Sequence, residues 1–421
     1  MTPTVIIGAG AAGIAAARTL HDANANVLLL EAGDRLGGRA HSVPLAGLLR
    51  QAGLAPTIPH DAHVDYGCGW LHSAKRNPWT AIAAQAGLKI DRASPNWGVQ
   101  WRDLGFPPVD ARSFGEAWER WETAAHAALG GPDRPLSDII AADDRWRPMI
   151  DAISGYANGA NLADVSLHDW AAYEDAATDD NWALPAGYGT LIAGHAAGIA
   201  VHLNTPVTRI DHSGRTLRLE TSAGTIEADR VIVAVPSTVI AAEALRFLPA
   251  LPAKTAAAAA LPLGIADKVF LHVAHPLWES HAHLIGDPHR AATASYRLSP
   301  FGWPIVEAFF GGDSADALEH HEAAVAFAID ELVALLGSDW RKRFTPLVAT
   351  RWRQAPWIGG SYSHARVGQV SARGRLSAPV DERIFFAGEA CHPHDFSTAH
   401  GAYETGVAAA RAVLAAGARS Q

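Results

Sequence analysis

The alternation of short apolar runs with helix-forming segments predicts a domain in which β-strands and α-helices follow each other. Near the N-terminus, the apolar runs Thr4–Gly8 and Val27–Glu31 flank the alanine-rich segment Ile14–Asp22. Runs of this kind are typical of buried parallel strands, and the segment between them has the composition of a helix. The sequence therefore predicts a strand, a turn at Gly8–Gly13, a helix and a second strand.

Similar patterns recur in the middle of the chain and near its C-terminal end. The predicted later strands are Val201–Leu203, Leu217–Thr221, Thr225–Glu227, Val231–Val235, Ala266–Val273, Ile305–Phe310 and Ile384–Ala387. Residues 110–180 predict a helical insertion, 315–336 one or two helices, and 399–416 a final helix. We predict an α/β fold in which a Rossmann-type domain carries an inserted α+β domain of sheet plus helices. The predicted boundaries are 1–78, 185–262 and 345–421 for the first domain, and 79–184 and 263–344 for the second.

Composition narrows the possible partners. The 421 residues carry a formal net charge of -9 without a basic run, which argues against nucleic acid and favours a cationic small molecule. Two cysteines, Cys68 and Cys391, form no disulfide framework, so we expect a reducing, cytoplasmic compartment. No spacing of metal ligands is evident, and we expect no metal. The apolar stretch Val5–Leu20 is interrupted by glycines, and we expect no membrane span.

The turn at Gly8–Gly13 has the spacing of a dinucleotide-binding loop. Gly8 permits the tight turn, Gly10 lets the backbone approach a pyrophosphate, and Gly13 lets helix and strand pack closely. The amides at the start of the helix, around Ala12, would bind the anion. Glu31 lies eighteen residues beyond Gly13, where an acid accepts hydrogen bonds from ribose hydroxyls. This spacing alone leaves NAD and FAD both open.

The segments that follow Glu31 and precede the last helix distinguish the two cofactors. Residues 31–39 (Glu-Ala-Gly-Asp-Arg-Leu-Gly-Gly-Arg) resemble the "E-x-x-x-R-x-G-G-R" continuation of flavin amine oxidases and of the glutathione-reductase-like group. Residues 385–390 and 397–406 resemble the "FAGE…HGA…SG" closing segment of the flavin amine oxidase family. The resemblance implies FAD, with phosphate contacts from paired glycines and arginines. The cofactor residues it implies here are Ala32, Arg35, Gly38, Arg39, Gly388, Glu389, Thr398 and Ala399.

Further segments that resemble this family are spread along nearly the whole chain. Residues 65–73 with Asn77-Pro78 resemble the "GA-x-W-I-H-G…NP" segment of spermine and acetylpolyamine oxidases, and 187–191 resemble "GYGxL". Residues 204–207 resemble the segment whose valine backbone holds the adenine, and 261–269 resemble "LPLG…KV". Trp352 and Gly359–Ser363 resemble the strand that faces the flavin ring. By this resemblance Gly69, Trp70, Leu71, Val207 and Trp352 also contact the cofactor.

The resemblance implies an FAD-dependent amine oxidase that transfers a hydride from the amine α-carbon to flavin N5. The imine product would hydrolyse, and O2 would reoxidise the flavin and become hydrogen peroxide. In the family, the lysine matched by Lys268 holds a water against flavin N5. His72 would sense or orient the amine, since an ordinary imidazole has a pKa of about 6.5. Trp352, Tyr362 and Thr398 complete the implied catalytic set.

Two departures from the family pattern bear on the substrate. Ser361 stands where covalent monoamine oxidases carry the flavin-linked cysteine, so we expect non-covalent FAD. Tyr362 matches one tyrosine of their aromatic cage, but Thr398 stands where the second would be. The stretch 397–402 is closer to animal spermine and acetylpolyamine oxidases and to lysine-specific histone demethylases, which favours a polyamine or another secondary or primary amine. An acidic cluster would attract a polycation or form a solvated loop face; it comprises Glu174, Asp175, Asp179 and Asp180.

Other functions remain open at this point. An L-amino acid oxidase resembles this pattern, but Gly67–Trp70 lacks the arginine that would bind a carboxylate. A flavin desaturase of a non-amine substrate shares the N-terminal motifs, although Lys268 and Trp352 fit it poorly. A non-catalytic FAD scaffold and an NAD-dependent dehydrogenase are more distant alternatives. We expect a small-molecule amine and O2 as partners, and a monomer or homodimer.

Overall fold

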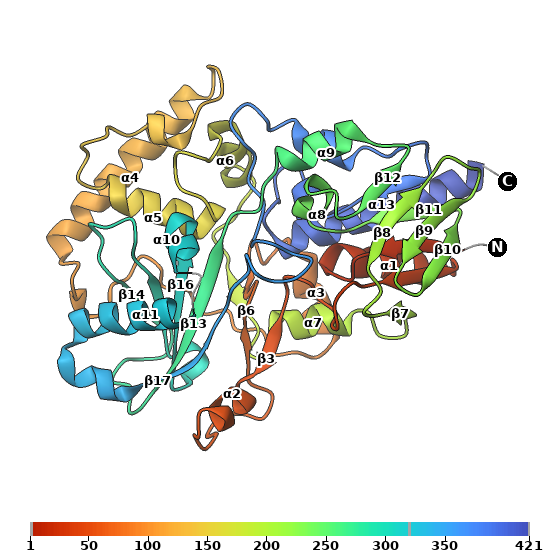
Figure 1. Cartoon of the computed structure of the whole chain (residues 1–421). Helices are drawn as coiled ribbons and strands as arrows, with labels where there is room; N and C mark the ends of the chain where they lie inside the picture. The colour runs from red at the N-terminus through yellow and green to blue at the C-terminus, as the bar shows by residue number, and fades with distance from the viewer. Residues whose placement is uncertain (1–2, 319–320, 420–421) are drawn as a thin grey trace.

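The computed structural model describes residues 3–318 and 321–419, which form two lobes (Figure 1). The first lobe is built on a five-stranded sheet in which every neighbouring pair is parallel. Its strands, in spatial order, are β18 (Ile384–Phe386), β11 (Arg230–Val233), β1 (Thr4–Ile7), β2 (Val27–Leu30) and β7 (Val201–His202). Val5 and Ile6 point to opposite faces and both are fully buried, as expected for a parallel sheet covered on both sides.

The two faces of this sheet are covered differently. On one face, α1 (Ala11–Asp22) packs against α13 (Ala399–Arg419), two helices from opposite ends of the chain (Figure 1). They approach closely, since a Cβ at Gly406 would lie 2.1 Å from the carbonyl oxygen of Ala12. On the other face lies a second sheet, and the two sheets share one hydrophobic core. The elements of that layer are β10 (Gly224–Ala228), β9 (Leu217–Thr221), β8 (Val207–Asp211), β12 (Arg246–Leu248), α8 (Ser237–Ala241) and α9 (Pro252–Ala259).

The second lobe is an antiparallel sheet with helices packed around it. Its strands, in spatial order, are β14 (Ala282–Ile285), β15 (Ser295–Leu298), β16 (Ile305–Gly311), β13 (Ala266–Val273) and β17 (Phe344–Ala349). Its helices are α4 (Pro108–Ala128), α5 (Arg147–Asn158), α6 (Leu167–Glu174), α10 (Gly312–Ala317) and α11 (His321–Leu336). Leu271 of β13 and Leu332 of α11 belong to the same buried cluster, so sheet and helix share a core.

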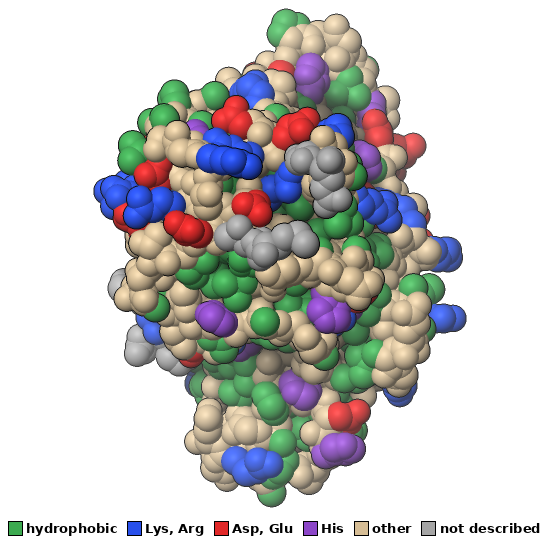
Figure 2. Space-filling model, turned by 90° about the vertical axis from the view of Figure 1, so that its right-hand side faces the viewer, with side chains coloured by type: hydrophobic (Ala, Val, Ile, Leu, Met, Phe, Trp, Pro, Cys, Tyr) green, Lys and Arg blue, Asp and Glu red, His purple; other side chains and the backbone are tan. Residues whose placement is uncertain are grey.

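Short elements complete the fold. They are β3 (Ser42–Pro44), α2 (Leu45–Gln51), β4 (His63–Asp65), β5 (Trp70–Leu71), α3 (Pro78–Gln85), β6 (Trp182–Ala183), α7 (Tyr188–Gly194) and α12 (Ala372–Ser377). Of these, α3 and α7 share a core with α1 and α13, and α12 packs on α9 in the first lobe. Short 3-10 helices are Trp101–Asp103, Leu136–Asp138, Pro300–Gly302, Ser338–Arg343 and Glu389–Cys391. In the parts of the chain that the structure describes, no helix has both the length and the apolar character needed to cross a bilayer. The face that carries both termini mixes acidic and basic side chains (Figure 2).

The predicted strand, turn, helix and strand at the N-terminus are confirmed. The helix begins at Ala11, three residues earlier than predicted, because Gly10 already occupies its N-cap position. The predicted strand over residues 359–363 is wrong. That segment bends, and only Ser363 forms a bridge, with Leu263. Gly359 and Gly360 have φ of 74° and 155°, which interrupts an extended strand.

Candidate cofactor site and active site

The glycine turn after β1 contains one glycine that the fold itself does not require. A Cβ at Gly8, whose φ is 99°, would lie 2.6 Å from the carbonyl oxygen of Ala234. A Cβ at Gly13 would lie 1.8 Å from the carbonyl oxygen of Gly8. At Gly10, by contrast, the nearest atom would be 3.9 Å away, on Gly37. Packing therefore explains Gly8 and Gly13, while the open space at Gly10 fits the close approach of a bound pyrophosphate.

Glu31 is held at the carboxyl end of β2 by two backbone amides. Ala9 N–H donates to Glu31 Oε2 at 2.7 Å, and Gly33 N–H donates to Oε1 at 2.8 Å. The loop that follows lies on the glycine turn, since a Cβ at Gly38 would be 3.3 Å from Gly10 Cα. The carboxylate thus stands beside the turn, where it can accept hydrogen bonds from ribose hydroxyls.

The neighbouring residues implied by the family resemblance lie around the same strand ends. Ala32 directly follows Glu31, and Arg35 donates to the carbonyl of Leu36 at 3.3 Å. Burial lowers the pKa of the Arg35 guanidinium. Thr205 N–H donates to the carbonyl of Glu31 at 2.8 Å, and Val207 begins β8 two residues later. The sequence-predicted nucleotide residues are therefore brought together at the carboxyl edge of the parallel sheet.

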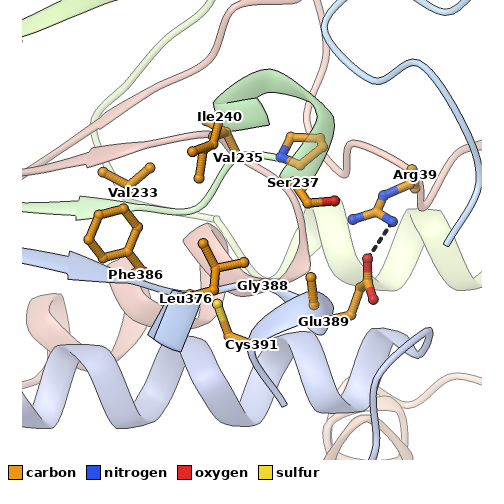
Figure 3. Close-up of a pocket in the computed structure, with 13 residues that line it drawn as sticks. Arg39, Val233, Val235, Ser237, Ile240, Leu376, Phe386, Gly388, Glu389 and Cys391 are labelled. Atoms are coloured by element: carbon orange, nitrogen blue, oxygen red, sulfur yellow. Dashed lines mark hydrogen bonds and ion pairs between the residues drawn. The ribbon is translucent and has the colours of Figure 1, made fainter. Parts of the chain in front are cut away.

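A small pocket lies at the carboxyl ends of β11 and β18, with Arg39 and Glu389 facing each other at its edge (Figure 3). Arg39 Nη1 lies 2.7 Å from Glu389 Oε1. Glu389 Oε2 accepts hydrogen bonds from the Ser363 hydroxyl at 2.6 Å and from Ser397 N–H at 2.9 Å. Burial alone would raise the pKa of Glu389, but the charge of Arg39 and these hydrogen bonds hold it below its usual value.

The backbone beside this ion pair is open on its outer side. Gly388 has φ of 141°, and a Cβ placed there would meet no atom within 4 Å. An open glycine next to a fixed carboxylate and an arginine fits a dinucleotide laid along the strand ends. Gly10, Glu31, Arg39, Gly388 and Glu389 all border this edge and fit a bound dinucleotide, and FAD is the one that the family resemblance implies.

Lys268 and Trp352 converge on one loop, residues 65–70, that leads from the first lobe. Lys268 Nζ donates to the carbonyl of Asp65 at 2.9 Å, and Trp352 Nε1 donates to the carbonyl of Tyr66 at 3.1 Å. A Cβ at Gly69 would lie 3.5 Å from Lys268 Nζ. The loop therefore brings Gly69 and its neighbours into contact with the lysine and the tryptophan.

A hydrogen-bond network fixes the backbones that carry these two side chains. Asp267 Oδ1 accepts from the Thr350 hydroxyl at 2.7 Å and from Trp352 N–H at 3.1 Å. The same hydroxyl accepts from Lys268 N–H at 2.8 Å. Lys268 and Trp352 thus share one anchor, although they lie far apart in the sequence.

Trp70 and Leu71 form β5, which pairs with β6 beside this loop. Leu71 is fully buried in the core of the first lobe. The Trp70 ring lies between Trp97, at a centroid distance of 5.3 Å, and the Arg297 guanidinium, 4.4 Å from its centroid. Trp70 therefore faces the second lobe, while Leu71 anchors the strand in the first.

His72 is a neutral imidazole in this environment. Asn181 Nδ2 donates to the carbonyl of Asp179 at 3.1 Å, which turns its Oδ1 toward His72 Nδ1 at 2.6 Å. Nδ1 is therefore the protonated nitrogen, and Nε2 carries the lone pair. Burial lowers the pKa of His72 to about 4. This geometry and the lowered pKa fit orienting an amine through Nε2, and the role of His72 stays a prediction.

The hydroxyls of Ser361, Tyr362 and Thr398 are engaged by the backbone. The Ser361 hydroxyl accepts a hydrogen bond from Ala266 N–H and donates one to the Ala266 carbonyl, both at 2.8 Å. The Tyr362 hydroxyl donates to the carbonyl of Tyr156 in α5. Thr398 Oγ1 accepts from Gly401 N–H at 2.9 Å and donates to the carbonyl of Asp395, so it caps α13 immediately before Ala399. Thr398 thus positions the start of that helix.

Two charged groups near Lys268 were not identified from the sequence. Glu307 and Arg297 line a small cavity together with Trp70 and Lys268. A signal was present, because Glu307 interrupts the apolar strand Ile305–Phe310. A carboxylate at such a position is buried only when it is paired.

Asp180 of the acidic cluster and a histidine cluster make local structural contacts. Asp180 accepts a hydrogen bond of 2.5 Å from Lys75 N–H, which anchors the loop before β6. Within residues 3–318 and 321–419, one group could hold a metal ion: His392, His394 and Asp395. His392 Nδ1 already accepts from Asp395 N–H at 2.7 Å, and its Nε2 lies 3.0 Å from Glu404. These contacts stabilise the segment before α13.

Comparisons with known proteins agree with this arrangement. A family model described as flavin containing amine oxidoreductase matches residues 11–172 and 133–414. The chain is 27% identical to polyamine oxidase 4 of Oryza sativa subsp. japonica over 96% of this chain and 87% of that protein. It is also 27% identical to human lysine-specific histone demethylase 2, over 98% of this chain but 53% of that protein. The solved structure of cyclohexylamine oxidase from Brevibacterium oxydans IH-35A has the same fold, with a TM-score of 0.77, 21% identity and complete coverage of both chains.

Proposed function

This chain belongs to the family of flavin-containing amine oxidoreductases, and from that premise we propose that it oxidises a polyamine or another secondary or primary amine with non-covalently bound FAD. The observation that carries the proposal is the convergence of Lys268 and Trp352 on the loop 65–70. Gly67 of this loop lies against the backbone of Arg39, which borders the edge that fits the dinucleotide. Gly10, Glu31, Arg39 and Glu389 would hold FAD, which when bound would supply the acceptor for a hydride from the amine α-carbon and pass the two electrons to O2, giving hydrogen peroxide.

The residues of the chain prepare the amine for this reaction. An amine must be unprotonated to lose a hydride, and the neutral His72 ring offers Nε2 as an acceptor for an amine N–H. Trp352 and the walls of the site exclude water and hold the amine in one orientation. Polyamines fit the proposal because plant polyamine oxidases are among the relatives, at 29% identity for the Arabidopsis thaliana polyamine oxidase 2.

Lys268 is proposed to move a proton when the flavin is reoxidised. Its ammonium lies in a buried position between Asp65 and Glu307, so its location is fixed. Ser361 replaces the cysteine of covalent enzymes, and its hydroxyl is engaged by Ala266. We therefore expect that denaturation releases free FAD.

The test is an anaerobic flavin-reduction screen with polyamines, aryl monoamines, secondary amines and L-amino acids. We expect polyamines or secondary amines to bleach the flavin. Bleaching by L-amino acids alone would overturn the substrate assignment, and no bleaching by any amine would overturn the activity. Lys268→Met is expected to slow reoxidation about 10²-fold or more. The exposed Lys342→Met is the matched control, and equal reoxidation rates in both variants would remove the role of Lys268.

A further inference from the structure

Lys268 has a buried partner that the family pattern does not predict. Glu307 Oε1 lies 2.7 Å from Lys268 Nζ, and the two side chains are only 12% and 8% exposed. The pair is built into the sheet: in the antiparallel register of β13 and β16, Phe270 is opposite Glu307. Lys268 is therefore diagonal to Glu307 on the same face, a spacing that long side chains can bridge.

Arg297 approaches the same carboxylate from the next strand. Its Nη1 lies 3.9 Å from Glu307 Oε2, and its guanidinium lies 4.4 Å from the Trp70 ring centroid and 4.7 Å from that of Phe301. Its Nη2 lies 3.2 Å from His281 Nδ1. Arg297 is thus held in place, and two cations share one carboxylate.

Of the charged groups that the structure describes around Lys268, Glu307 is the one whose carboxylate contacts the ammonium. The remaining titratable groups around Lys268 and this cavity are Asp65, Cys68, His63, His281 and Asp91. The Asp65 carboxylate accepts hydrogen bonds from the amides of Tyr188 and Gly189, and it offers only its backbone carbonyl to Lys268. Asp91 lies 2.9 Å from His281 Nε2. Glu307 is therefore the carboxylate in direct contact with the ammonium.

We propose that Glu307 is a positioning residue that fixes the Lys268 ammonium and keeps it protonated, while Arg297 weakens this effect by sharing the carboxylate. This inference rests on the role of Lys268 in the proposed function. Without the charge of Glu307, Lys268 and Arg297 become two cations in one buried cavity. Lys268 should then give up its proton more readily, since arginine remains charged. Without Arg297, the carboxylate serves Lys268 alone and protonation becomes more favourable.

The two substitutions Glu307→Gln and Arg297→Gln should therefore shift the titration of Lys268 in opposite directions. The chain has five lysines, so NMR of protein enriched in [13C,15N]-lysine can follow each one, with Lys268→Met assigning the signal. We expect the pH midpoint of Lys268 to fall by about 1–3 units in Glu307→Gln and to rise in Arg297→Gln. The exposed Glu227→Gln is the matched control and should leave the midpoint unchanged.

The titration is measured on both FAD-free and FAD-loaded protein, so it reads the charge of Lys268 independently of turnover. An unchanged midpoint in Glu307→Gln, or shifts of the same sign in both variants, would overturn the inference. If Glu307→Gln fails to fold, Arg297→Gln and Glu307→Asp carry the test: the first must raise the midpoint and the second must keep it within about one unit of the native value. If amines reduce the flavin of the native protein but the Lys268 midpoint is unshifted in Glu307→Gln, only this inference is refuted. If no amine reduces the flavin of the native protein, the proposed function is refuted.

Discussion

Two glycines of the same turn should respond in opposite ways to one added methyl group. At Gly10, a Cβ would meet nothing closer than 3.9 Å, and the residue has φ of -80°, which alanine adopts readily. At Gly13, a Cβ would lie 1.8 Å from the backbone oxygen of Gly8. Gly10→Ala should therefore damage cofactor binding and spare the fold, while Gly13→Ala should damage the fold itself.

The magnitudes follow from these contacts. In the FAD-free protein, Gly10→Ala should change the free energy of unfolding by less than about 1 kcal/mol, since a modest N-cap loss opposes the reduced entropy of the unfolded chain. Displacing one charge-assisted hydrogen bond to phosphate costs about 1.5–3 kcal/mol, which weakens FAD binding roughly 10- to 150-fold. In Gly13→Ala the backbone of the turn must move, and such overpacking costs about 1–3 kcal/mol or more.

The assay combines denaturant unfolding of the FAD-free protein with FAD titration by fluorescence quenching. Gly47→Ala is the matched control, because a Cβ at Gly47 in α2 would meet no atom within 4 Å and lies away from the turn. FAD binding by Gly10→Ala as tight as that of the native protein would refute the assignment of this turn to the pyrophosphate. So would a loss of stability in Gly10→Ala as large as that in Gly13→Ala.

Three further predictions concern buried charges. Because the pKa of Glu389 is lowered in the folded protein, its ionised carboxylate stabilises the fold above the ordinary carboxyl pKa, and this stability is lost as the pH falls through the pKa of the folded state. In Glu389→Gln, the free energy of unfolding should therefore depend less on pH below about pH 4.3. Burial lowers the pKa of His72 to about 4, so the native protein should lose stability as the pH falls from 6.5 toward 4. In urea titrations across this window, His72→Gln should reduce that loss of stability by up to roughly 3 kcal/mol. Arg373→Met should cost about 3–5 kcal/mol, because it leaves the 1%-exposed Asp169 carboxylate unpaired, and adding Asp169→Leu should restore part of that stability in guanidinium unfolding.

The strands of the parallel sheet could be predicted because each carries its own local signal. β1 and β2 are short apolar runs next to a glycine turn or an acid, and β18 runs into Gly388. β14 and β15 were not predicted, because their sequences, Ala-His-Leu-Ile and Ser-Tyr-Arg-Leu, mix polar with apolar residues and lack the continuous apolar run of β1 and β2. Their formation depends on pairing with β16, which is a tertiary contact.

The candidate site also contains features that local motifs predict and features that depend on tertiary contacts. The positions bordering the dinucleotide follow from local motifs, and the structure places Glu31 and Gly38 against the glycine turn as those motifs imply. The backbone bonds of Thr398 and the neutral state of His72 could not be predicted, since each depends on residues distant in the sequence or on the degree of burial. Motifs indicated which residues gather, and packing determined their protonation and hydrogen bonding.

Lys268 and Glu307 show what a single-strand reading misses. Each interrupts an apolar strand, and taken alone each indicates an exposed edge position, because an isolated charge is too costly to bury. The register that pairs Phe270 with Glu307 makes them diagonal neighbours, and their ion pair then makes both burials possible. A single charged residue in an apolar strand therefore does not tell whether its side chain is exposed or buried. Opposite charges at diagonal positions of two strands that can pair indicate a buried ion pair. Since Lys268 lies at the position proposed to face the flavin, we propose that Glu307 belongs to the same functional unit.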